Sequence, residues 1–113
     1  MFRARRDALS AGLALALVAC ATVPPGEDPK GKELKAQASP VLAALMSFHK
    51  DRGEYPVSLH ELVPRYLEAV PFGPGLRYDR DPRVIEFVYP APWPRSAKVL
   101  CFAQVGEREW VCR

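Results

Sequence analysis

The chain has 113 residues, of which 49% are hydrophobic and 26% are charged, an ordinary length and composition for one globular domain. Its formal charge of +3 includes the charged residues of 1–19, a segment that we expect to be removed, and the remainder carries 13 basic and 12 acidic side chains. A balance so close to neutral leaves little excess positive charge to attract the phosphates of a nucleic acid, so no nucleic-acid partner is predicted.

The N-terminal segment has the layout of a secretory signal. Residues 1–19 begin with three arginines, continue through an apolar run from Ala8 to Val18, and end in small residues before Cys20. The apolar run is about half of the roughly 20 residues that a membrane-spanning helix needs, so it is too short for a retained transmembrane anchor. We therefore expect residues 1–19 to be cleaved from an exported protein.

Leu17-Val18-Ala19-Cys20 resembles a bacterial lipobox. The resemblance implies thioether lipidation of Cys20, cleavage before it and acylation of the new amino terminus; the alternative is an ordinary secretory signal with a chance cysteine. Because each buried methylene contributes roughly 0.8 kcal/mol, several acyl chains hold a protein firmly to a bilayer, which is the first expected partner. In this family an aspartate after the cysteine favours the inner membrane, so Ala21 favours the outer membrane, facing the periplasm.

Residues 20–32 are predicted to be the lipidated cysteine and a flexible linker, because their prolines and glycines cannot build a core. A single globular domain is expected over residues 33–113.

Apolar side chains recur at helical spacing from Glu33 to Arg52 and predict the main helix. Ser39-Pro40 leaves two alternatives open, a kink within the helix or a separate turn before it. The apolar face is expected to contain Leu34, Ala38, Val41, Leu42, Leu45 and Phe48.

A second, short helix is predicted after Gly53, which suits the left-handed conformation that closes a helix. Ser58 and Glu61 have the spacing of a capping box, which marks the start of this helix. Pro64 interrupts the helix early and Pro71 prevents its continuation. Its inward-facing side chains are expected to be Leu59, Leu62, Val63 and Leu67.

The C-terminal part alternates with period two and predicts two hairpins, or about four antiparallel strands. In the first, residues 76–79 and 84–89 flank a turn at 80–83, with Ile85, Phe87 and Tyr89 on one face. Residues 90–94 hold prolines at alternate positions, which cannot donate to a sheet ladder, so this stretch is predicted to be a stiff connection that separates the hairpins.

In the second hairpin, residues 98–104 and 108–112 flank Val105-Gly106-Glu107. A two-residue loop at Gly106-Glu107 places Cys101 opposite Cys112, at a hydrogen-bonded position of the ladder. The two cysteines fit no zinc or redox motif, and an exported protein favours a disulfide over two free thiols. We therefore predict a Cys101–Cys112 disulfide, while a longer loop remains an alternative that would offset the pair.

The stretch from Gly53 to Pro71 resembles the start of the globular head in type II secretion major pseudopilins and related type IV pilin-like proteins. The resemblance implies a helix that runs into a small antiparallel sheet. It implies a place in or beside a secretion or pilus-like assembly. The chain has a lipobox where that family has a Gly-Phe cleavage site and an apolar stalk helix. The matching positions are Gly53, Tyr55, Pro56, Ser58, Leu59, Leu62, Tyr66, Leu67, Val70 and Pro71.

Residues with catalytic or metal-binding chemistry are few. His49 and His60 lack a histidine or cysteine at metal-ligand spacing, so we interpret them as helix-surface side chains and predict no metal or cofactor. Ser58 and His60 are too close within one helical turn to face each other as a nucleophile and its general base. No enzymatic activity is predicted. Asp79 and Asp81 resemble a cation loop, since major pseudopilins bind calcium in the head, but the surrounding arginines favour a solvated hairpin tip.

Trp93 and Trp110 are the candidate partner-binding residues, because aromatic side chains are enriched in interface hot spots. The alternative is that they cover the edges of a small core.

We interpret the chain as an α+β protein with a main helix and a short second helix on an antiparallel sheet of about four strands. Its expected function is that of a membrane-tethered envelope lipoprotein whose non-enzymatic head binds another envelope protein. The competing hypothesis is a small periplasmic ligand-binding or enzymatic module.

Overall fold

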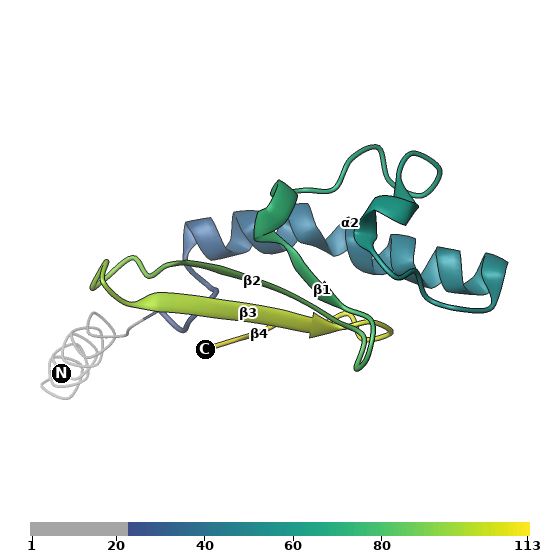
Figure 1. Ribbon diagram of the computed structural model, residues 1–113. Coiled ribbons are helices and arrows are strands. Elements are labelled where there is room, and N and C mark those ends of the chain that lie inside the picture. The colour runs from purple at the N-terminus through teal and green to yellow at the C-terminus, as the bar shows by residue number, and fades with distance from the viewer. Residues whose placement is uncertain (1–22) are drawn as a thin grey trace, which may run out of the picture.

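The computed structural model describes residues 23–113 (Figure 1). The predicted signal segment and Cys20 lie outside the described residues. One long helix packs on a four-stranded antiparallel sheet of order β1-β2-β3-β4, which confirms the expected α+β fold. Within residues 23–113, no helix is long and apolar enough to cross a membrane. The elements are α2 (Pro29–Arg52), the 3-10 helices η2 (Leu59–Leu62) and η3 (Gly73–Gly75), and the strands β1 (Arg77–Asp79), β2 (Val84–Pro90), β3 (Lys98–Gln104) and β4 (Val111–Cys112).

Helix α2 begins at Pro29 and not at Glu33, so the prediction of a linker that extends to residue 32 is wrong in its last part. The cause is a start signal in the sequence itself. The side chain of Asp28 caps the helix by accepting the Gly31 amide at 3.1 Å, and Pro29 occupies the first turn, where a missing amide hydrogen costs nothing. The predicted C-terminal stop is confirmed, since Gly53 has a φ of 80° and donates to the His49 carbonyl.

Pro40 lies inside one continuous helix, so the alternative of a separate N-terminal turn is wrong. Proline removes one backbone hydrogen bond and crowds the preceding turn. The Ser39 hydroxyl donates to the Lys35 carbonyl at 2.6 Å in this turn. The helix continues because its apolar face is held on the core on both sides of Pro40, through Ala38 and Val41.

The predicted second helix is a 3-10 helix of 4 residues, shorter than expected. The Glu61 carboxylate accepts the amides of Val57 at 2.6 Å and Ser58 at 3.1 Å, which confirms its predicted role at the start. Val63 has an extended backbone because it precedes Pro64, and this ends the helix. Leu59 and Leu62 are buried as predicted, whereas Val63 and Leu67 are half-buried.

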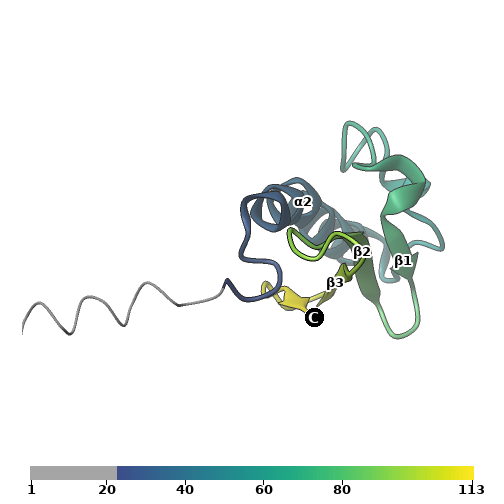
Figure 2. The same cartoon turned by 90° about the vertical axis from the view of Figure 1, so that its left-hand side faces the viewer.

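The sheet is a continuous meander rather than two separated hairpins. Strands β2 and β3 pair along their whole length, from Val84 opposite Gln104 to Pro90 opposite Lys98. The predicted stiff connection therefore belongs to a loop, residues 91–97, that joins two paired neighbours. Ile85, Phe87 and Tyr89 share one face as predicted, and this face is buried. Figure 2 shows α2 lying over one face of the sheet.

The predicted pairing of Cys101 with Cys112 is confirmed, and the two residues form a disulfide with a Cα–Cα distance of 4.1 Å. The turn differs from the predicted two-residue loop at Gly106-Glu107. The Glu107 amide donates to the Gln104 carbonyl, so the turn closes around Val105 and Gly106. Leu100 and Arg113 exchange both backbone hydrogen bonds at 2.9 Å, so the neighbouring cysteines occupy a non-hydrogen-bonded position. The predicted hydrogen-bonded position is therefore wrong, since the shifted turn changes where the ladder resumes.

Candidate functional site

The end of the domain nearest to Cys20 in the sequence is built by a short segment that we call the strap, residues Val23–Asp28. The strap turns back on itself through a hydrogen bond from the Glu27 amide to the Pro24 carbonyl at 3.1 Å. Gly26 and Asp28 are buried, while Val23 is 63% exposed. The strap therefore belongs to the packed domain, although the sequence predicted it to be linker.

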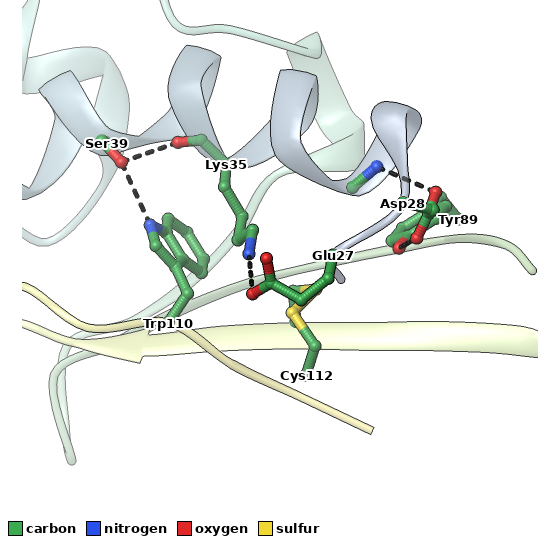
Figure 3. Close-up of polar contacts among 9 residues, drawn as sticks. Glu27, Asp28, Lys35, Ser39, Tyr89, Trp110 and Cys112 are labelled. Carbon is green, nitrogen blue, oxygen red and sulfur yellow. Dashed lines mark hydrogen bonds and ion pairs between the residues drawn. A yellow bond between two sulfur atoms is a disulfide. The ribbon is translucent and has the colours of Figure 1, made fainter. Parts of the chain in front are cut away.

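A buried polar contact ties the strap to the sheet (Figure 3). The Tyr89 hydroxyl of β2 donates to Asp28 Oδ1 at 2.6 Å, and Asp28 Oδ2 accepts the Gly31 amide. Only 6% of Asp28 and 3% of Tyr89 is exposed to solvent. One carboxylate thus caps α2 and binds the sheet, which makes it the joint between the two layers of the fold.

The two partners influence each other's protonation. The hydrogen bond from Tyr89 lowers the pKa of Asp28, although burial opposes the shift. Burial raises the pKa of Tyr89 to about 12, and the hydrogen bond to Asp28 adds to this effect. Asp28 is therefore a carboxylate and Tyr89 a neutral phenol at neutral pH, the states that the hydrogen bond requires.

Two glycines allow the strap to lie close to the sheet. A Cβ atom on Gly26 would collide with the Sγ of Cys112, and one on Gly31 would collide with the Tyr89 hydroxyl. Gly26 also has a φ of +83°, which L side chains rarely adopt. The strap is therefore packed directly against the disulfide, which holds β4 beneath it.

The two candidate tryptophans occupy different environments. Trp110 is half-buried, with its ring centroid 5.3 Å from that of Phe87, and its Nε1 donates to the Ser39 hydroxyl at 3.1 Å (Figure 3). This environment matches the alternative prediction for Trp110, that it covers the edge of the core. Trp93, by contrast, is 86% exposed. Trp93 therefore has the larger area available for contact with a partner.

Trp93 projects from the loop between β2 and β3. The base of this loop is fixed by hydrogen bonds from the Ala91 amide to the Ala97 carbonyl at 2.9 Å and from the Ala97 amide to the Pro94 carbonyl at 3.0 Å. Proline residues on both sides of Trp93 fix two further backbone angles. A stiff backbone lowers the entropy that must be lost when such a side chain docks.

The sheet face opposite α2 has an apolar patch, the open-face patch. Val88 lies opposite Leu100, and Phe102 lies opposite Val111. Val88 is 51% exposed and Val111 is 52% exposed, while the other two are half-buried. The sequence analysis missed this patch, although the alternation in β2 and β3 placed apolar residues on both faces.

The residues considered for catalysis do not form a catalytic arrangement in the described part of the chain. Ser58 and His60 line one hollow of about 370 Å³, but within residues 23–113 they form no hydrogen bond with each other. The His49 ring stacks on that of Tyr55, with centroids 4.3 Å apart. The Asp79 carboxylate accepts the Asp81 amide at 3.1 Å, a local turn contact. In the described part of the chain, residues 23–113, no His, Cys, Asp or Glu side chains gather in a group of three or more that could hold a metal ion.

The strap contacts were missed in the sequence analysis, but part of the signal was present. Asp28-Pro29 is a recognisable helix start, whereas the proline-rich composition of the segment favoured a linker. Nothing in the sequence indicated that Tyr89, 61 residues away, would donate to Asp28.

Searches of protein-family models, curated proteins and solved structures found no match to this chain. The function is therefore inferred from its own residues.

Proposed function

We propose that the protein is an envelope lipoprotein, tethered to a bilayer through acylated Cys20, whose non-enzymatic head binds another envelope protein. The lipobox-like sequence supports the tether, and Ala21 favours the outer membrane, facing the periplasm. The disulfide supports an oxidising compartment, since such bonds are rare in reducing ones. The likeness of Gly53–Pro71 to pseudopilin heads supports a place beside a secretion or pilus-like assembly.

The open-face patch is the observation that carries the binding role. Four apolar side chains form two directly opposed pairs on a face that α2 leaves uncovered. Contiguous exposed apolar surface of this kind marks interaction sites more often than isolated exposed residues do. Charged groups adjoin it: the Arg113 guanidinium lies over the Phe102 ring at 5.6 Å, and Glu86, opposite Phe102, pairs with Arg77 at 3.5 Å. An apolar centre with a charged rim is the usual anatomy of a protein interface.

Site-specific photo-crosslinking in intact cells tests this role. A photoreactive phenylalanine analogue at Val88 should give one discrete adduct with another protein. The same analogue at Lys50, an exposed position near the C-terminal end of α2, is the matched control and should give none. A second substitution, Phe102→Ser, should reduce the Val88 adduct without reducing the amount of folded protein.

Three outcomes would contradict the proposed binding role. Equal adducts at Val88 and Lys50 would show that contact with the patch is not specific. An adduct of twice the chain's own mass would replace the foreign partner with a second copy. A tight complex with a small molecule in the hollow beside Ser58 and His60, together with no Val88 adduct, would favour the ligand-binding alternative.

A further inference from the structure

We propose that the loop of residues 91–97 is a second membrane contact, which inserts Trp93 into the interfacial region of the bilayer that holds Cys20. The inference rests on the proposed lipid tether and names the partner of Trp93. It replaces the expectation that Trp93 contacts a protein. Its basis is the position of the loop, its backbone chemistry and its charge.

The structure shortens the tether. Gly26 is buried in the domain and lies six residues after Cys20. Because an extended chain spans at most about 3.4 Å per residue, Gly26 cannot be more than about 20 Å from a lipidated Cys20. The packed strap therefore keeps one end of the domain close to the bilayer, in place of the free linker that the sequence suggested.

The loop lies at this same end. Tyr89, which binds Asp28 of the strap, is the penultimate residue of β2, and the loop begins two residues later. Both ribbon views place the connection between β2 and β3 beside the strap, where the described chain begins (Figures 1 and 2). The far end of α2 is about 30 Å from its first turn, so only one end of the domain is brought to the membrane.

Prolines and internal hydrogen bonds account for part of the loop's backbone, which leaves the amides of Trp93, Arg95 and Ser96 to bond with lipid headgroups or water. Pro90, Pro92 and Pro94 have no amide hydrogen, and the amides of Ala91 and Ala97 already donate within the loop. Unpaired backbone donors exclude irregular chain from the hydrocarbon core, so the hydrated interfacial region is the depth that this loop can occupy. Tryptophan is the side chain that favours the boundary between hydrocarbon and headgroups.

The charge around Trp93 has the sign that suits a phospholipid surface. Residues 90–98 include Arg95 and Lys98 and no acidic side chain. The nearby carboxylate of Glu27 is paired with Lys35 at 3.2 Å, and Asp28 is buried. Each basic residue near an anionic membrane raises the membrane-binding constant by roughly fivefold. The exposed Val23 adds an apolar side chain at the same end.

The test uses the mature, lipidated protein reconstituted into vesicles that contain bromine-labelled phospholipid, which quenches tryptophan on contact. Wild-type protein should show a blue-shifted emission and strong quenching, and Trp93→Phe should lose both, leaving only the signal of Trp110. The matched control moves the probe by combining Trp93→Phe with Lys50→Trp. That probe, at the other end of α2, should remain unquenched by lipid and accessible to aqueous iodide. Arg95→Gln with Lys98→Gln should lower the quenching in anionic vesicles more than in neutral ones.

The outcomes separate this inference from the tether. Failure of the protein to remain with the vesicles would overturn the tether and this inference together. Stable association with Trp93 open to iodide and unquenched by lipid would overturn the membrane contact while the tether stands. Equal lipid quenching at positions 93 and 50 would overturn the proposed orientation. A protein adduct from a photoreactive residue at position 93 in cells, with no lipid quenching, would assign Trp93 to a protein partner.

Discussion

Replacing Tyr89 by Phe should loosen the joint between the strap and the sheet. The substitution removes one oxygen and leaves the ring, so packing around the aromatic side chain is kept. Asp28 keeps the Gly31 amide on Oδ2 but loses the donor to Oδ1 at 2.6 Å. Because Asp28 is only 6% exposed, water cannot readily replace this donor.

A hydrogen bond to a charged group contributes about 1.5–3 kcal/mol, so we expect Tyr89→Phe to lower the free energy of unfolding by about 2 kcal/mol. In a domain of this size, each kcal/mol changes the melting temperature by about 4–8 °C, which gives a drop of about 8–16 °C. Tyr78→Phe is the matched control. The Tyr78 hydroxyl donates to a neutral acceptor, the Pro56 carbonyl, at 2.8 Å, so its loss should cost about 1 kcal/mol.

The pH dependence gives a second readout. The pKa of Asp28 is lowered in the folded state, so its contribution is present above about pH 4 and is lost as the pH falls through the folded value. The raised pKa of Tyr89, about 12, gives a contribution that is present below about pH 10 and is lost as the pH rises toward the folded value. Tyr89→Phe removes the main cause of the lowered Asp28 pKa, so its acid loss should be smaller than that of the wild type, and the alkaline loss from Tyr89 should vanish.

Urea unfolding of the purified mature protein between pH 3 and pH 11 measures both effects. If Tyr89→Phe lowered the free energy of unfolding no more than Tyr78→Phe and kept the acid and alkaline dependence of the wild type, the hydrogen bond to Asp28 would not be the joint between the strap and the sheet. A large loss in both variants with unchanged pH dependence would show that packing, and not the Asp28 hydrogen bond, holds the strap.

Three further predictions concern the disulfide, Gly26 within the strap and the exposed tryptophan. Reduction of the disulfide should lower the free energy of unfolding by somewhat under about 3 kcal/mol, measured by urea unfolding with and without reductant, and an unchanged midpoint would count against it. Gly26→Ala should destabilise more than Gly53→Ala, because both positions have a positive φ but only Gly26 has neighbours within 4 Å; equal costs in thermal melts would contradict the close packing. Trp93→Ala should leave the melting temperature nearly unchanged while Trp110→Ala lowers it, and a large loss at Trp93 would place that residue in the core.

The features that the sequence predicted well are those set by local chemistry. Glu61 binds the amides at the start of η2 because it is three residues from Ser58, and Gly53 ends α2 because it alone tolerates that backbone conformation there. Strand alternation placed Ile85, Phe87 and Tyr89 of β2 on one face, and the structure buries all three. The opposition of Cys101 and Cys112 followed from counting back from a glycine turn, although the hydrogen bonds of that turn proved different.

The features that the sequence did not predict depend on contacts between distant segments. Composition made the strap resemble a linker, and only the contact between Asp28 and Tyr89 makes it part of the fold. The prolines after β2 suggested a separation of two hairpins, but the pairing of β2 with β3 decides the topology. The exposure of Trp93 and the partial burial of Trp110 likewise depend on whether a neighbour such as Phe87 is present in three dimensions.

The proposed tether of the domain to a bilayer through Cys20 is tested most directly by the mass of the mature N-terminus. Protein extracted from membranes should be digested and its N-terminal peptide analysed by mass spectrometry, with Cys20→Ser as the control. We predict a peptide that begins at Cys20 and has a diacylglycerol thioether and an amide-linked acyl chain, whereas Cys20→Ser should remain unprocessed or leave the membrane. A mature chain that begins at another residue, or one with an unmodified Cys20, would contradict the tether.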